Sequence, residues 1–153
     1  MSEVHRIAKQ LQRTFQGRAF HGPAVEEALD GVTLKMAKAR SPNGAHNIWQ
    51  IVLHMTFWQD TVRKWLKGNT TRPEPGEDWP KIKERTSGEW KKAQWNLRRS
   101  YELLRDEVMV QDEARLEEPI FDGMSKVYVC LHGIIQHNIY HAGQISLLRK
   151  IHS

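Results

Sequence analysis

The sequence predicts an all-α fold: a four-helix bundle whose long first connection carries short helices. Four segments repeat apolar residues every three or four positions, which is the period of an α-helix. Glycine and proline cluster between these segments, and no segment reads convincingly as a strand. The chain of 153 residues, 39% of them hydrophobic, suits one domain over residues 1–153 with a substantial core.

The first two long helices are predicted over residues 3–16 and 47–67. The apolar stripe of the first consists of Val4, Ile7, Ala8, Leu11 and Phe15. Asn47 followed by Gln50 is a relaxed form of the capping box that starts a helix. Gly68 stands where a glycine commonly ends one.

The other two long helices are predicted over residues 87–108 and 126–151. Thr86 and Glu89 form a T-x-x-E capping box at the start of the third helix. Ser125 is the expected N-cap of the fourth, which is the longest.

The connections differ in character. Residues 17–46 hold apolar residues at helical spacing, so we expect one or two short helices there, begun by Pro23. Residues 69–85 contain three prolines, and residues 111–123 contain Pro119, so both are predicted to be irregular loops. Such long connections permit a bundle topology other than a simple up-down-up-down order.

Composition restricts the class of protein. No apolar run is long enough for a transmembrane helix, and the charged N-terminus lacks the apolar core of a signal peptide. Cys130 is the single cysteine, which excludes an internal disulfide and a cysteine-based zinc site. A cytoplasmic location is therefore expected. The net charge of +5 mildly favours anionic partners.

The histidines carry the strongest chemical signal. His137 and His141 are four residues apart, which places two imidazoles on one face of a helix as a metal ion requires. Both lie on the apolar face of the fourth helix, and His54 lies on that of the second. Buried histidines satisfied by ordinary core contacts are the alternative, although no carboxylate on these faces can pair with them. The other five, none expected to be a ligand, are His5, His21, His46, His132 and His152.

Two motifs connect these histidines to a known family. Residues 46–54, HNIWQIVLH, resemble the H-x-I-W-x-x-x-x-H pattern of DinB-like (DinB/YfiT) proteins. Residues 137–145, HNIYHAGQI, resemble the closing H-x-x-x-H-x-G-Q-I motif of that family, and residues 21–23, HGP, its entry into the first connection. The resemblance implies a four-helix bundle with a divalent metal ion held by His54, His137 and His141.

A site of three neutral imidazoles leaves coordination positions open, as catalytic sites do. Zinc or nickel is the expected metal, and iron, cobalt and manganese also suit the ligands. Gln144 and Gln50 share the histidine faces and are candidates to orient substrate or bound water, and Trp58 is a candidate pocket wall. The inward faces offer no general base, so a base for hydrolysis would have to come from a loop or from the metal-bound hydroxide.

The resemblance implies two chemistries, because DinB-like proteins include metal-dependent hydrolases and enzymes that transfer low-molecular-weight thiols to electrophiles. The expected partner is then a small-molecule substrate such as one of these thiols, and the missing base slightly favours transfer. A non-enzymatic metal-binding protein is an alternative. Nucleic-acid binding is a weaker one, because acidic residues interrupt the basic tract over residues 81–99. We also expect a homodimer, with Trp79 and Phe121 as exposed apolar residues for its contact, and no membrane association.

Overall fold

The computed structural model describes residues 1–153 and is all-helical, with no β-strand. The four long helices are α1 (Glu3–Phe15), α4 (Ile48–Leu66), α5 (Ser87–Met109) and α6 (Val127–His152). The short elements are α2 (Val25–Leu29), α3 (Leu34–Lys38) and two 3-10 helices, η1 (Pro42–Gly44) and η2 (Glu113–Glu117). The predicted fold class is confirmed, including short helices in the long first connection.

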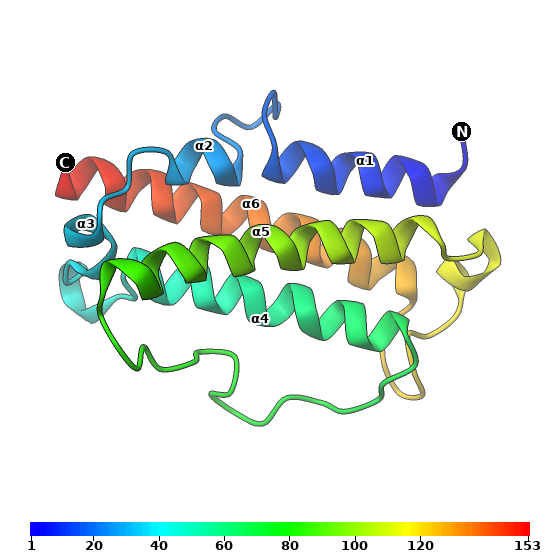
Figure 1. Ribbon diagram of the computed structural model, residues 1–153. Helices are drawn as coiled ribbons and strands as arrows, with labels where there is room; N and C mark the ends of the chain where they lie inside the picture. Colours follow the sequence, from blue (N-terminus) through cyan, green and yellow to red (C-terminus); the bar gives the residue numbers. More distant parts are fainter.

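The four long helices form a bundle in which neighbours along the chain are not all antiparallel. Helix α1 packs against α5 and α6, and α4 packs against the same two helices. Figure 1 shows α1 and α6 running in one direction and α4 and α5 in the other. The connection between the parallel helices α4 and α5 must therefore return along the 19 residues of α4, about 28 Å at 1.5 Å per residue.

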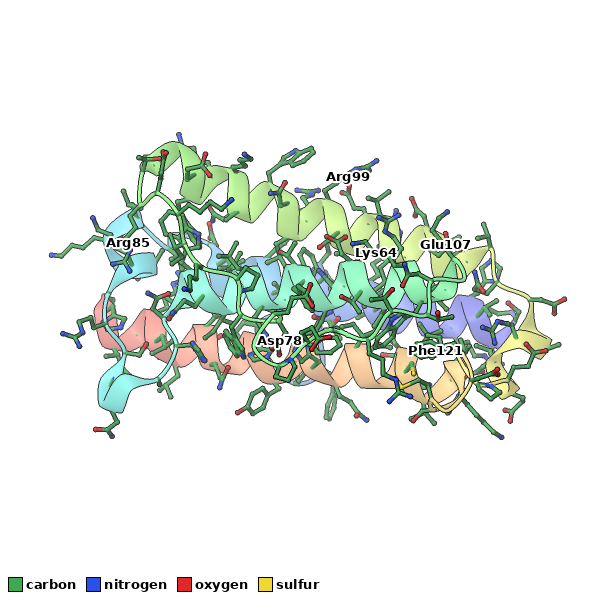
Figure 2. The ribbon with its side chains drawn as sticks, turned by 90° about the horizontal axis from the view of Figure 1, so that it is seen from below. Lys64, Asp78, Arg85, Arg99, Glu107 and Phe121 are labelled. Atoms are coloured by element: carbon green, nitrogen blue, oxygen red, sulfur yellow. The ribbon has the colours of Figure 1, made fainter.

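This long connection, residues 67–86, runs along one side of the bundle (Figure 1). Figure 2 shows it passing from the Phe121 end of the molecule, past Asp78 near the middle, to Arg85. Near its start the guanidinium of Arg72 lies 5.8 Å from the centre of the Phe121 ring. The topology thus carries a proline-rich segment past both α4 and α6.

The helix ends follow the predicted capping chemistry except at the starts of α2 and α6. Helix α2 begins at Val25 and not at Pro23, and its N-cap Ala24 has no capping side chain. The Asn47 side chain accepts from Gln50 N at 2.9 Å while the Gln50 side chain accepts from Asn47 N at 2.8 Å, so the predicted capping box is present. The prediction of Ser125 as the N-cap of α6 is wrong, because the N-cap is Lys126. An antiparallel bridge between Pro119 and Lys126 keeps Lys126 extended, so the helix begins one residue later.

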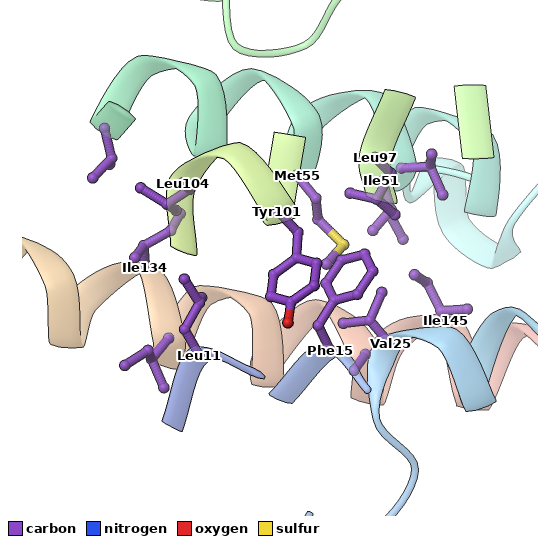
Figure 3. Packing of buried hydrophobic residues seen from close by; sticks show 14 of the residues in the cluster. Leu11, Phe15, Val25, Ile51, Met55, Leu97, Tyr101, Leu104, Ile134 and Ile145 are labelled. Atoms are coloured by element: carbon purple, nitrogen blue, oxygen red, sulfur yellow. The ribbon is translucent and has the colours of Figure 1, made fainter. Parts of the chain in front are cut away.

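The interior is one cluster of 33 buried hydrophobic residues, contributed by every long helix, by the short elements α2, α3 and η2, and by the loops. At its centre the rings of Phe15 and Tyr101 stack with centroids 4.3 Å apart, close to Met55 (Figure 3). Trp49, Trp65 and Trp90 are buried, as expected of core tryptophans. Trp95 of α5, in contrast, is 63% exposed. No helix is both long and apolar enough to span a bilayer.

A buried polar network sets the register of the bundle next to the histidines. The Gln59 amide of α4 donates to the Ser100 hydroxyl of α5 at 2.8 Å and accepts from the Asn138 amide of α6 at 3.2 Å. All three side chains are buried, so shifting α6 along α4 would leave them without partners in a low-dielectric interior. Because Asn138 follows His137 directly, this network also helps to fix where α6 presents His137 and His141.

Candidate metal centre

Three imidazoles converge between α4 and α6. The Nε2 atom of His137 lies 3.0 Å from Nε2 of His54 and 3.1 Å from Nε2 of His141. No cysteine, aspartate or glutamate belongs to this cluster. The two histidines predicted from their four-residue spacing and the one predicted on the facing helix are therefore brought together. His54 and His141 are buried and His137 is half-buried.

Hydrogen bonds on the outer edges of two rings determine which nitrogen faces inward. His54 Nδ1 donates to the backbone oxygen of Asp78 at 2.7 Å. His141 Nδ1 donates to the side-chain oxygen of Gln144 at 2.7 Å. Because the partners are carbonyl oxygens, each Nδ1 carries the proton and each Nε2 presents a lone pair to the centre of the cluster. A partner of this kind is typical of metal-ligating histidines.

The electrostatics keep all three rings neutral near pH 7. Burial, followed by the charges of His141 and His54, lowers the pKa of His137 to about 3. Burial is also the largest cause that lowers the pKa of His141 to about 4, and it lowers the pKa of His54 despite the raising effect of Asp78. Neutral imidazole is the form that binds a metal ion.

A bound divalent cation explains the arrangement of the three Nε2 atoms better than hydrogen bonds among the three rings do. A neutral His137 has one proton, which can make one good hydrogen bond to only one of its two neighbours. A cation between the rings uses all three lone pairs. Nitrogen ligands placed tetrahedrally about 2.1 Å from zinc are about 3.4 Å apart, so the observed 3.0 and 3.1 Å require only a small expansion. The Nδ1 atom of His137 has no hydrogen-bond partner.

The long connection supplies contacts that the sequence did not predict. The Asp78 carboxylate accepts from Trp58 Nε1 at 3.3 Å and lies 3.6 Å from His54 Nδ1. The Trp79 ring is stacked between His46 and His54, with centroid distances of 3.5 and 3.8 Å. No periodicity links residues 78 and 79 to the helices, so only the return path of the chain places them here.

The other candidate residues differ in whether they contact the histidine cluster. Gln144 contacts the site directly, whereas the side-chain oxygen of Gln50 is used by the capping box of α4. Trp58 borders a hollow of about 190 Å³ together with Cys130 and His137. Cys130 is not part of the histidine cluster.

The two residues proposed for a dimer contact are not freely exposed. Trp79 is half-buried in its stack, and the ring of half-buried Phe121 lies 5.5 Å from that of Trp65, measured between centroids. Both are held in place within the chain by the path of the loops. They are therefore less exposed than expected, and their contact with a second copy stays a prediction.

Comparison with known proteins gives the family. The sequence profile of the DinB superfamily matches residues 20–145, which is most of the chain and includes all three histidines. The chain belongs to the DinB superfamily. No curated protein and no solved structure matches it. The assignment to the DinB superfamily agrees with the helical fold and with a histidine cluster that could hold a metal ion.

Proposed function

We propose that this DinB-superfamily protein is a divalent-metal enzyme that transfers a low-molecular-weight thiol to a small electrophilic substrate. The observation that carries the proposal is the convergence of three neutral imidazoles with no carboxylate in their cluster. His54, His137 and His141 would hold the cation. A divalent cation with open positions lowers the pKa of a bound thiol or water and stabilises its anion.

The absence of a negative ligand favours an anionic nucleophile. Three imidazoles leave the full charge of a divalent cation uncompensated, whereas a carboxylate ligand would cancel part of it. A thiolate is a soft anion that suits zinc and nickel. In the transfer, the thiol loses its proton to solvent, its sulfur forms a bond to the electrophilic carbon, and the leaving group departs with the bonding electron pair.

The position of Asp78 argues against hydrolysis assisted by a loop carboxylate. Hydrolysis requires either a general base that faces the attacking water or a metal-bound hydroxide. Asp78 is the nearest candidate, but its carboxylate lies at the Nδ1 edge of His54, away from the Nε2 edge that faces the cluster. Its hydrogen bond with Trp58 holds it there. Asp78 therefore acts as a positioning residue for His54.

Two measurements test the proposal. Elemental analysis of the purified protein is expected to find about one divalent ion per chain, and little in a variant carrying His137→Ala and His141→Ala. His132→Ala is the matched control, because His132 lies on the same helix outside the cluster and should keep the metal. Equal metal content in the parent and the double variant would show that these histidines do not hold the ion.

The metal-loaded protein is then assayed with a panel of thiols and electrophiles, and separately with esters and amides. Product that contains the thiol sulfur and depends on the metal supports transfer. Metal-dependent cleavage of esters or amides without thiol would replace this proposal with the hydrolase. Metal binding without turnover of any substrate would favour the alternative of a non-enzymatic metal-binding protein.

Two further expectations stay predictions. Homodimer formation is measured by sedimentation. Nucleic-acid binding, which we do not expect, would show as an affinity that falls steeply with salt. Arg98 and Arg99 of the basic tract already form ion pairs with Glu102, and Arg98 also pairs with Glu26, which reduces their availability for phosphates.

A further inference from the structure

A cavity of about 460 Å³ opens directly beside the histidine cluster. It lies between the C-terminal half of α6, the 3-10 helix η1 and Trp79, and we call it the α6 pocket. His141 and Gln144 line it and also belong to the candidate metal centre. A molecule in the α6 pocket therefore lies next to the ring that would hold the metal.

The α6 pocket has no charged lining. None of its eleven lining residues is a lysine, arginine, aspartate or glutamate, although 27% of the chain is charged. The larger hollow, of about 600 Å³, is lined by Glu26, Asp30 and Arg98 among others, and lies away from the histidines. Apart from a metal ion held by His141, a charged substrate would find no lysine, arginine or carboxylate to pair with in the α6 pocket, whereas an apolar one would replace weakly held water.

Aromatic side chains form two walls of the α6 pocket, and both are held in place. Trp79 is fixed by its stack between His46 and His54, and it meets His141 edge to face with centroids 6.3 Å apart. The hydroxyl of Tyr140 accepts from the Gln144 amide at 3.2 Å. Walls fixed in advance reduce the entropy that a bound ring would otherwise have to offset.

The mouth of the α6 pocket is also apolar. Tyr140 and Leu147 are 64% and 61% exposed, and Ile151 at the far end is 49% exposed. Exposed apolar side chains next to a cavity, with one or two polar groups inside, are typical of a small-molecule site. The volume lies within the range of about 300–1,000 Å³ found for such sites.

We infer that the α6 pocket binds the uncharged, apolar body of the electrophile, of the size of one or two aromatic rings. This inference rests on the proposed function, because it assigns the second reactant to the side of the cluster that His141 and Gln144 border. The smaller hollow beside His137, of about 190 Å³, lies on the other side and has less room for a ring system.

Two fluorescent probes with the same ring skeleton test the charge preference. N-phenyl-1-naphthylamine is neutral, and 1-anilinonaphthalene-8-sulfonate adds one negative charge. We expect the metal-free parent to bind the neutral probe in a saturable manner and the sulfonate at least about tenfold more weakly, because no lysine or arginine lines the α6 pocket to pair with it. Equal or tighter binding of the sulfonate would overturn the inference.

Two variants of one helix test the location. Leu147→Arg places a charge at the mouth of the α6 pocket, and should weaken binding of the neutral probe about tenfold or more. Val129→Arg is the matched control, because Val129 is 53% exposed on the same helix but does not line the α6 pocket. Both substitutions put a good helix former at an exposed position, so both variants should fold. Equal binding by the two variants would overturn the assignment.

Metal content separates the two hypotheses. If the parent holds metal but Leu147→Arg and Val129→Arg bind the probe equally, the α6 pocket assignment fails and the proposed function stands. If the parent holds no metal but the probe results are as expected, the proposed function fails and the cavity stands as an apolar binding site. Alternatively, the parent binds no probe and forms a dimer that Leu147→Arg splits into monomers. That result would show that a second copy of the chain covers this face, and it would overturn the inference.

Discussion

Acid should destabilise the metal-free protein through the histidine cluster. The pKa values of His137 and His141 are lowered from 6.5 to about 3 and about 4 by burial and by the neighbouring charges. Both groups take up protons in the unfolded chain at a pH where the folded protein still excludes them. The stability is therefore fully present above the unfolded pKa and falls as the pH drops from there toward the folded values.

The expected size of the loss follows from these pKa values. Between about pH 7 and about pH 5, each of the two histidines protonates in the unfolded state only, which lowers the free energy of unfolding by about 2 kcal/mol. Together they account for about 4 kcal/mol, a large share of the roughly 5–15 kcal/mol that stabilises a typical domain. Bound metal should oppose the loss, because protons compete with the cation for the same nitrogens.

Urea unfolding followed by far-UV circular dichroism, in the presence of a chelator, measures this effect. The parent is compared with a variant carrying His137→Gln and His141→Gln, which cannot take up these two protons and should lose much less stability on acidification. His132→Gln, on the same helix but outside the cluster, should behave like the parent. If the parent and the double variant lose the same free energy between the two pH values, the cluster is not the cause and the reasoning fails.

Three further changes probe the site and the core. Gln144→Leu removes the acceptor of the His141 proton and should weaken metal binding about 10–100-fold in competition with a chromophoric chelator, whereas exposed Gln136→Leu should not. Met55→Ala should lower the free energy of unfolding in urea by about 2–5 kcal/mol, because Met55 is fully buried; a loss well below this range would contradict the packing. Gln59→Leu should cost about 1–3 kcal/mol by leaving the Asn138 amide without its partner, and a neutral result would argue against the buried network.

Local patterns predicted most of the helical structure because their causes are local. The capping box of Asn47 and Gln50 and the apolar stripe of α1 depend on residues within one or two turns, so they could be read directly. Ser125 failed as an N-cap for the opposite reason. A bridge from Pro119 to Lys126 constrains the backbone there, and that contact belongs to the fold of the loop rather than to the helix.

The candidate metal centre likewise combines features with local causes and features that depend on the tertiary fold. The four-residue spacing of His137 and His141 and the inward position of His54 were visible in the sequence, because helical periodicity alone orients them. Asp78 and Trp79 were not, because they come from an irregular segment whose path depends on the parallel arrangement of α4 and α5. Periodicity sets the face on which a side chain lies, but only the packing of helices and the return of the loop determine what it meets there.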